Sequence, residues 1–215
     1  MKHIISIEGN IGSGKSTLLS KLKERGLDAI FIQEPVDEWN DIKDENGTTI
    51  LNQFYNNQEK YSFPFQMMAY VSRLNNLITT TSNENHYLFI MERSLRADAE
   101  IFEKMLYDDN KLNTYEHQIY HKWVQLFSKN YKSNKTIYIR ADPQVSYDRI
   151  KTRNRNGEET IPIEYIKECH NYHEEMIKKI NTNEVLILDG NENIYDDDDK
   201  VLHKWFDAII KFIIQ

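Results

Sequence analysis

The fold is decided by residues 9–17, which read Gly9-Asn10-Ile11-Gly12-Ser13-Gly14-Lys15-Ser16-Thr17 and fit the phosphate-binding pattern G-x-x-x-x-G-K-[ST]. An apolar run precedes this stretch, and a helix-like run with three leucines follows it. Glycines let the backbone N–H groups of such a loop point inward around an anion, and the positive end of the following helix strengthens the same field. The alternative is a glycine turn with a chance Lys-Ser pair, which the flanking runs disfavour. We therefore expect these residues to bind nucleotide phosphates, with Lys15 on the outer phosphates and the Ser16 hydroxyl on Mg²⁺.

Five short apolar runs alternate with helical stretches along the chain. They are His3–Glu8, Ala29–Gln33, Tyr87–Met91, Thr136–Arg140 and Glu184–Leu188. Nearly continuous apolar character is typical of strands buried on both faces of a parallel sheet. The alternation predicts a doubly wound α/β fold with a five-stranded parallel sheet flanked by helices. Ligands of such sheets lie beyond the carboxyl ends of the strands, which makes Glu34 and Glu92-Arg93-Ser94 candidates for the site.

A long insertion separates the second and third of these runs. We expect Asp41–Thr49 to be a loop, followed by two helices over residues 49–61 and 63–78. The core-facing stripe of the second helix includes Gln66 and Arg73, so this helix either lines a wet pocket or carries those groups on the rim.

A further helix is predicted from Tyr115 to Tyr131. Its i, i+4 stripe of Ile119, Trp123, Phe127 and Tyr131 indicates either packing within the chain or a subunit interface. The sequence leaves both interpretations open.

The composition narrows the class of protein. The chain has 215 residues, which we expect to form one domain, and its net charge of −7 argues against a nucleic-acid backbone as the main partner. The single cysteine, Cys169, excludes a disulfide within the chain and is interpreted as a small residue on a helix. No run reaches membrane-spanning length, and the N-terminus shows no signal segment. We expect a soluble, cytoplasmic protein with no membrane partner.

Three arginines, Arg149, Arg153 and Arg155, lie in a stretch that Pro162 closes, and we expect residues 149–162 to form a lid. Arg149 and Arg153 are four residues apart and therefore share a helix face. Such a cluster in an acidic protein suggests a triphosphate as the counter-anion. The alternative is surface pairing with the nearby acids Asp148, Glu158 and Glu159.

Taken together, these landmarks resemble the deoxyribonucleoside kinase family. The matching pieces are Gly9–Thr17, Glu34-Pro35-Val36 with Trp39, Tyr55, Phe63-Pro64-Phe65-Gln66, Glu92-Arg93-Ser94 with Asp98 and Phe102, and Arg149–Arg155 continuing to Ile161-Pro162. They extend from residue 4 to about residue 190, in the family's order and nearly its spacing. The resemblance implies a P-loop α/β kinase that uses ATP and Mg²⁺ to phosphorylate the 5′-hydroxyl of a small deoxyribonucleoside. It also implies a homodimer formed through long helices.

The resemblance assigns catalytic roles to four residues. A sugar hydroxyl is a poor nucleophile at neutral pH, and Glu34 matches the family's general base. Arg93 matches the arginine on the 5′-oxygen side of the substrate, where negative charge gathers, and Lys15 acts on the donor phosphates. Glu92 matches a carboxylate associated with Mg²⁺ beside Ser16, with a salt bridge to Arg93 as its rival interpretation.

The resemblance also implies a nucleoside pocket. The Gln66 amide offers a donor and an acceptor to the edge of a base, while Trp39 and Phe102 supply flat apolar walls beside Phe65. Tyr55 and Glu158 match the pair that grips the 3′-hydroxyl. The choice of Glu158 over Glu159 depends on register, because Gly157 stands where relatives often have an acid.

Three pocket positions bear on the choice of base. In the resemblance, Ala69, Arg73 and Asp98 look like the deoxycytidine and deoxyguanosine kinases, because an Arg–Asp pair leaves no apolar room for a thymine methyl group. We therefore expect deoxyadenosine, deoxyguanosine or deoxycytidine to be preferred over thymidine. The segment Asn191–Ile194 resembles the loop that reads the donor base.

Two other functions remain as alternatives. A nucleoside monophosphate kinase of the thymidylate kinase kind would need an additional phosphate-binding arginine near the acceptor, and Arg96 is the only spare candidate. A nucleotide-dependent switch protein is disfavoured, because Asn134-Lys135-Thr136 lacks the acid of a guanine-reading N-K-x-D stretch.

Overall fold

The sheet carries the fold. The computed structural model describes residues 2–155, 158, 160–192, 194 and 199–214. Five parallel strands lie in the order β2-β3-β1-β4-β5. They are β1 (His3–Gly9), β2 (Ile30–Ile32), β3 (Leu88–Glu92), β4 (Lys135–Arg140) and β5 (Val185–Asp189). Each predicted strand agrees with the structure to within one residue at either end, so the expected doubly wound α/β sheet is confirmed.

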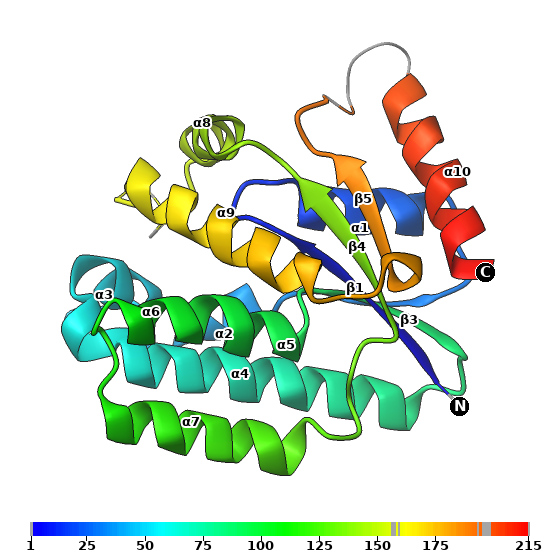
Figure 1. Ribbon diagram of the computed structural model, residues 1–215. Helices are drawn as coiled ribbons and strands as arrows, with labels where there is room; N and C mark the ends of the chain where they lie inside the picture. The colour runs from blue at the N-terminus through cyan, green and yellow to red at the C-terminus, as the bar shows by residue number, and fades with distance from the viewer. Residues whose placement is uncertain (1, 156–157, 159, 193, 195–198, 215) are drawn as a thin grey trace.

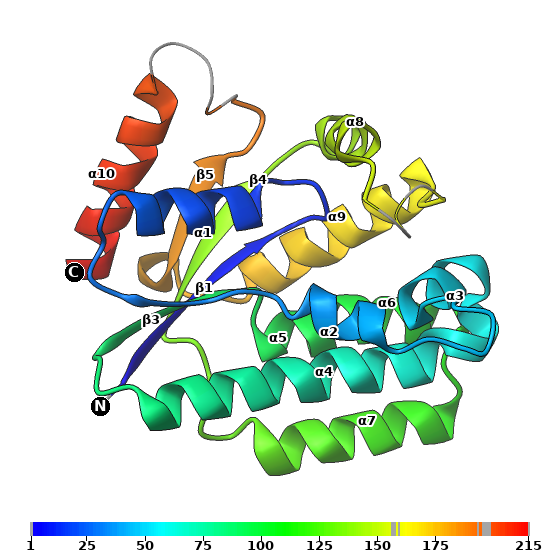
Figure 2. The ribbon, with the colours of Figure 1, turned by 180° about the vertical axis from the view of Figure 1, so that it is seen from behind.

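Helices cover both faces of the sheet (Figures 1 and 2). On one face, Ile5 and Ile7 of β1 pack with residues of α1 (Lys15–Glu24) and α10 (Lys200–Ile214). On the other face, Ile4 packs with residues of α4 (Gln58–Asn83). This alternation follows from the two-residue period of a strand.

The remaining helices surround these layers. They are α2 (Val36–Asp41), α3 (Ile50–Asn56), α5 (Leu95–Ala97), the π-helix η1 (Asp98–Glu103), α6 (Lys104–Asp108), α7 (Thr114–Phe127), α8 (Pro143–Arg153), α9 (Ile163–Lys178) and the short 3₁₀ turn η2 (Thr182–Glu184). Helix α7 lies outside α4, away from the sheet (Figure 1). Among the described residues, no helix combines the length and apolar character needed to cross a membrane.

The boundary between the two helices of the insertion differs from the prediction. We expected it beside Pro64, but α3 ends at Asn56 and α4 runs from Gln58 through Pro64 to Asn83. The Asn57 side chain accepts a hydrogen bond from the backbone N–H of Lys60 and so caps α4, which decides where the helix begins. Gln66 and Arg73 lie on α4, as expected for the second helix of the insertion, and both are buried.

Three of the four residues in the predicted apolar stripe are exposed, whereas the fourth, Tyr131, packs against the core. Ile119, Trp123 and Phe127 keep 47%, 41% and 44% of their surface exposed, and Tyr131 lies beyond the end of the helix. The interpretation of the stripe as internal helix packing is therefore wrong for those three residues. The interpretation as a subunit interface stays a prediction.

Cys169 is confirmed as a small buried residue on α9. Its burial raises the thiol pKa to about 12, so the side chain stays protonated and unreactive.

Candidate active site

The carboxyl ends of β1, β2 and β3 open into one cavity of about 680 Å³. All but three of the predicted site residues line it, namely Ile11, Gly12, Ser13, Gly14, Lys15, Ser16, Thr17, Glu34, Trp39, Tyr55, Phe65, Gln66, Ala69, Arg73, Glu92, Arg93, Phe102, Arg149, Arg153, Arg155 and Glu158. Gly9, Asn10 and Asp98 are not among the lining residues; each instead contacts a residue that is, as described below. The sheet topology therefore brings together segments that lie far apart in the sequence.

The glycine loop owes its shape to positions where a side chain would not fit. Gly12 has φ +78°, and a Cβ there would run into the backbone of Ser146. A Cβ on Gly9 would lie 2.8 Å from the carbonyl oxygen of Ile139. The Asn10 amide donates a hydrogen bond to the carbonyl of Ile166, 2.8 Å away, and so ties the loop to α9. These contacts hold the loop in the anion-binding conformation.

Lys15 lies folded over this loop. Its ammonium group donates hydrogen bonds to the carbonyl oxygens of Gly9 and Asn10, at 3.0 and 2.8 Å. Burial, together with the nearby charge of Arg93, lowers the pKa of Lys15 to about 7. A phosphate group at this position would supply the negative charge that the buried amine lacks.

Ser16 and Glu92 form the candidate metal site. The Ser16 hydroxyl donates a hydrogen bond to Glu92 Oε1 at 2.6 Å, at the point where α1 begins beside the end of β3. A hydroxyl and a carboxylate are the hard oxygen ligands that suit Mg²⁺, so this pair fits that ion. The rival interpretation of Glu92 is not realised in the described part of the chain, because Arg93 forms its ion pair with Glu34 instead.

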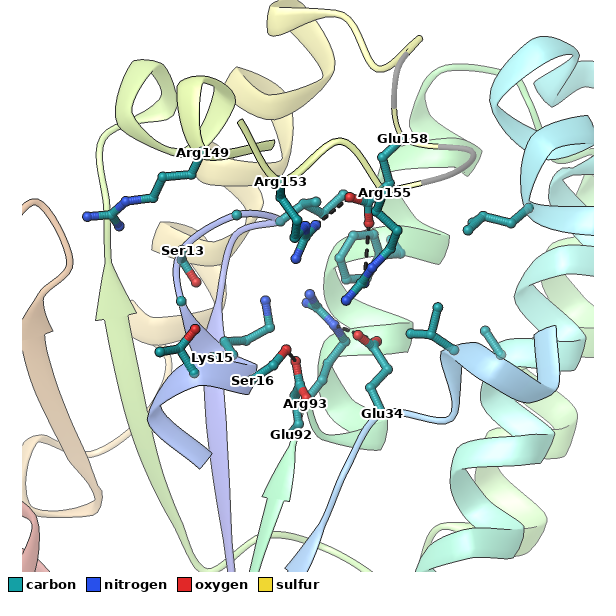
Figure 3. Close-up of a pocket in the computed structure, with 18 of the residues that line it drawn as sticks. Ser13, Lys15, Ser16, Glu34, Glu92, Arg93, Arg149, Arg153, Arg155 and Glu158 are labelled. Atoms are coloured by element: carbon teal, nitrogen blue, oxygen red, sulfur yellow. Dashed lines mark hydrogen bonds and ion pairs between the residues drawn. The ribbon is translucent and has the colours of Figure 1, made fainter. Parts of the chain in front are cut away.

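Glu34 lies directly after β2, between two arginines. Its Oε1 accepts a hydrogen bond from Arg73 at 2.8 Å. It also accepts one from Arg93 at 3.2 Å (Figure 3). Burial alone would raise the pKa of Glu34, but the charges of Arg73, Arg93 and Lys15 outweigh it and lower the pKa to about 2. The carboxylate is therefore ionised at every physiological pH.

Arg93 has a strained backbone that a buried acid helps to hold. Its φ of +64° lies in the left-handed region, which is uncommon for a residue other than glycine. The next backbone N–H, that of Ser94, donates a hydrogen bond to Glu8 Oε1 at 2.9 Å. The Arg93 guanidinium lies 4.5 Å from the centre of the Phe102 ring. Glu8 was not predicted as a site residue, although its position as a carboxylate within a buried strand was a visible signal.

The predicted pairing of Arg73 with Asp98 is present in the structure. Arg73 Nε donates to Asp98 Oδ2 at 2.7 Å, and both side chains are 3% exposed. Because the same guanidinium also reaches Glu34, one arginine connects Asp98 to the candidate general base.

Aromatic side chains form the walls of the other half of the cavity. Trp39 meets Phe65 edge-to-face at 5.6 Å, and its indole N–H donates to the Ser72 hydroxyl. Gln66 is 3% exposed, and no described residue forms a hydrogen bond with its amide, which leaves those polar atoms for a ligand. Tyr165, which the sequence analysis missed, also lines the cavity, with its ring edge-to-face against Tyr55 at 6.1 Å.

Of the three arginines of the expected lid, Arg149 points away from Arg153 and Arg155 (Figure 3). Arg149 donates to the carbonyl oxygens of Gly190 and Glu192, whereas Arg153 and Arg155 both form ion pairs with Glu158. The shared helix face of Arg149 and Arg153 therefore does not make their charged ends converge. The alternative of pairing with a nearby acid is realised for Glu158.

Several residues named in the predictions for this side of the cavity lie outside the described part of the chain. These are Gly157, Glu159 and, within the segment Asn191–Ile194, Asn193. Ile194 itself lines the cavity.

Arg96, the spare arginine that a monophosphate kinase would need, pairs with Glu100 at 2.6 Å and is not among the residues that line the cavity.

Comparisons with known proteins agree with this geometry. A family model described as deoxynucleoside kinase matches residues 5–213. The deoxycytidine kinase of Bos taurus is 33% identical over 230 residues, covering 93% of this chain and 88% of its own length. A probable deoxycytidine kinase of Fowlpox virus is 31% identical over 220 residues, covering 98% and 89%. The mitochondrial deoxyguanosine kinase of Xenopus laevis is 30% identical over 196 residues, covering 83% and 74%. The family match includes every segment that lines the cavity.

Proposed function

The chain belongs to the deoxynucleoside kinase family and is a nucleoside kinase, and on this premise we propose that it transfers the terminal phosphoryl group of ATP to the 5′-hydroxyl of a deoxyribonucleoside. One observation carries the proposal: the glycine loop with Lys15, the carboxylate of Glu34 and the aromatic walls around Gln66 all line a single cavity. A phosphate donor and a nucleoside would thus meet beside an ionised acid.

Glu34 is the proposed general base. Its pKa of about 2 keeps it ionised, and its hydrogen bonds to Arg73 and Arg93 hold the carboxylate in place. A substrate hydroxyl that takes over the Arg93 contact would remove part of the positive charge beside Glu34. The pKa of the carboxylate would then rise toward its ordinary range, where it accepts a proton more readily.

The donor side is assigned to cations and oxygen ligands. Ser16 and Glu92 would hold Mg²⁺, which neutralises phosphate charge when it is bound. Lys15 and Arg93 would stabilise the charge that develops on the transferred group. Arg153 and Arg155 would exchange their ion pairs with Glu158 for the donor phosphates, and that exchange would free Glu158 to act with Tyr55 on the 3′-hydroxyl.

The acceptor side is assigned to the aromatic half of the cavity. We expect the base to lie between Trp39 and Phe102, beside Phe65, with its edge against the Gln66 amide. Ala69 and the Arg73–Asp98 pair close the far end with charged groups, which supports deoxyadenosine, deoxyguanosine or deoxycytidine as substrates over thymidine. The similarity to a deoxycytidine kinase and a deoxyguanosine kinase supports the same choice.

The rival, a nucleoside monophosphate kinase, is disfavoured by one position. Arg96 would have to bind the phosphate of the acceptor, but it pairs with Glu100 away from the cavity lining.

A substrate panel tests the proposal directly. The four deoxynucleosides and their 5′-monophosphates are each incubated with ATP and Mg²⁺, and kcat/KM is compared. We expect a free deoxyadenosine, deoxyguanosine or deoxycytidine to give the highest value. The highest value for thymidine would overturn the base preference, and faster turnover of dAMP or dCMP than of the free nucleosides would favour the rival.

We further propose that residues 1–215 act as one cytoplasmic domain and as a homodimer through the exposed stripe of α7. The proposed partner is then a small deoxynucleoside, and the proposal includes no nucleic-acid or membrane partner.

A further inference from the structure

We propose that Glu103, His117 and His121 form a binding site for a divalent transition-metal ion of the Zn²⁺ class, separate from the active site. In the described part of the chain these three side chains are the one cluster of three or more histidine, cysteine or acidic residues that could hold a metal ion, with their ligand atoms all within 4.8 Å of one another. None of the three lines the active-site cavity.

Two elements supply the ligands. His117 and His121 are four residues apart on α7, so their imidazoles lie one turn apart on the same side of the helix, with ring centres 4.5 Å apart. Glu103 is the last residue of the π-helix η1, a rare conformation that frequently marks functional positions. Packing of α7 beside η1 brings the two histidines to the carboxylate.

The distances suit a metal ion. His117 Nδ1 lies 2.7 Å from Glu103 Oε1, and His121 Nε2 lies 3.0 Å from Glu103 Oε2. Zn²⁺ binds nitrogen and oxygen at about 2.0–2.2 Å, so tetrahedral ligands around it lie roughly 3.3 Å from one another. The two histidine nitrogens would have to move roughly 0.3–0.6 Å away from the carboxylate oxygens to make room for the ion between them.

The surroundings favour a metal ion over a purely structural role. Glu103 is fully buried, whereas the His117 and His121 side chains are 29% and 36% exposed, so an ion can enter from solvent and meet a compensating negative charge. Tyr107 stacks on His117 at 3.9 Å and fixes the orientation of its ring. Two imidazoles and one carboxylate, with room for water as the fourth ligand, are a ligand set that Zn²⁺ takes.

A bound ion would tie α7 to η1. The same π-helix carries Asp98, which pairs with Arg73, and Phe102, which lies beside Arg93. Metal binding would therefore stabilise the segment that supports the nucleoside side of the active site, without taking part in phosphoryl transfer.

The test is titration of metal-free, untagged protein with Zn²⁺ in excess Mg²⁺. Calorimetry measures the stoichiometry and affinity of binding, and thermal unfolding measures the shift of the midpoint. The test variant combines His117→Asn and His121→Gln, because these amides keep a donor at the Nδ1 and Nε2 positions and preserve the hydrogen bonds to Glu103. His86→Gln is the control, since His86 faces a single carboxylate, Asp28. We expect one Zn²⁺ per chain and a raised midpoint in the wild type and the control. The double variant should lose the shift and bind Zn²⁺ about tenfold more weakly or worse.

Absence of stoichiometric binding in the wild type, or an unchanged affinity in the double variant, would overturn the proposal. A second measurement on the wild-type chain covers a double variant that fails to fold. In NMR spectra of the histidine rings, Zn²⁺ should shift the His117 and His121 signals while the His203 signals stay in place. Equal shifts of all three, or of none, would contradict the site.

Discussion

At the scale of single residues, neighbouring positive charges keep the candidate general base ionised, and exposure to water does not. Glu34 accepts hydrogen bonds from Arg73 and Arg93, and its pKa of about 2 follows from their positive charge in a buried setting. Glu34 is thus already ionised at pH 5, so a fall of kcat/KM between pH 7 and pH 5 would have to come from another group.

Replacement of Glu34 by Gln tests the assignment. The amide keeps the size of the side chain but cannot accept the hydroxyl proton, so we expect kcat to fall by about 10²–10⁴-fold with little change in KM. Steady-state phosphorylation of the preferred deoxynucleoside measures this, with Glu38→Gln on the exposed side of α2 as the matched control. A kcat within threefold of wild type, in protein with a normal circular dichroism spectrum, would remove Glu34 from the role.

The lowered pKa of Lys15 predicts that nucleotide binding is accompanied by proton uptake. Its pKa is lowered to about 7 in the ligand-free protein, from an ordinary value of 10.5. Phosphate groups around the amine would restore a high pKa, so between those two values the nucleotide complex holds a proton that the free protein lacks. Below pH 7 both states are protonated and the uptake disappears.

We expect close to one proton to be taken up per nucleotide at pH 8.5, and far less at pH 6. Calorimetry of nucleotide binding in HEPES and in Tris measures the uptake, because the two buffers differ in ionisation enthalpy. In Lys15→Arg the side chain stays charged at both pH values, so any remaining binding should show no uptake. The same heat in both buffers at pH 8.5 for the wild type would refute the assignment.

At the scale of elements, two residues of the π-helix η1 form ion pairs with arginines, and we expect the two pairs to contribute unequally to the free energy of unfolding. Asp98 pairs with Arg73 of α4 in a fully buried setting, whereas Glu100 pairs with Arg96 where both side chains are about a third exposed. Removal of the Asp98 charge takes away one of the two carboxylates that pair with the buried Arg73, which keeps its ion pair with Glu34, while an exposed pair contributes little.

We therefore expect Asp98→Asn to lower the free energy of unfolding by about 2 kcal/mol, as for the loss of a hydrogen bond to a charged group, and Glu100→Gln to lower it by less than about 1 kcal/mol. Urea denaturation followed by circular dichroism compares the two variants on the same helix. Equal losses would mean that the buried pair does not anchor η1 to α4.

At the scale of the whole molecule, one helix presents apolar side chains to solvent. Tyr115, Ile119, Trp123, Leu126 and Phe127 of α7 are between 41% and 79% exposed. A stripe of large apolar residues along the outermost helix is typical of a surface that a second subunit covers.

Charge on this stripe should separate the proposed dimer. We expect the double variant Ile119→Lys and Trp123→Glu to elute as a monomer in size-exclusion chromatography with light scattering, where wild type elutes as a dimer. Tyr87→Glu, a charge on an exposed aromatic residue away from α7, is the control and should stay dimeric. A monomeric wild type at micromolar concentration would contradict the interface.

Sequence patterns and tertiary contacts decided different features of this protein. The pattern of residues 9–17 and the five apolar runs sufficed for the phosphate loop and the parallel sheet, because glycine conformation, strand burial and strand-end position follow from local chemistry. The order of the motifs sufficed for the family. The start of α4 could not be placed in this way. Both Asn57 and Pro64 could mark the first turn of the helix, and in the structure the helix begins at the cap that Asn57 provides.

The pairing of charges was decided only when the elements packed together. Arg73 reaches both Asp98 and Glu34, Arg149 turns toward the Gly190 carbonyl, and Glu103 meets two histidines of α7. The family resemblance predicted only the Arg73–Asp98 pair among these contacts. The others join side chains from different elements, whose distance depends on how helices pack on the sheet. Periodicity assigns a side chain to a face, and only tertiary packing selects its partner across the interface.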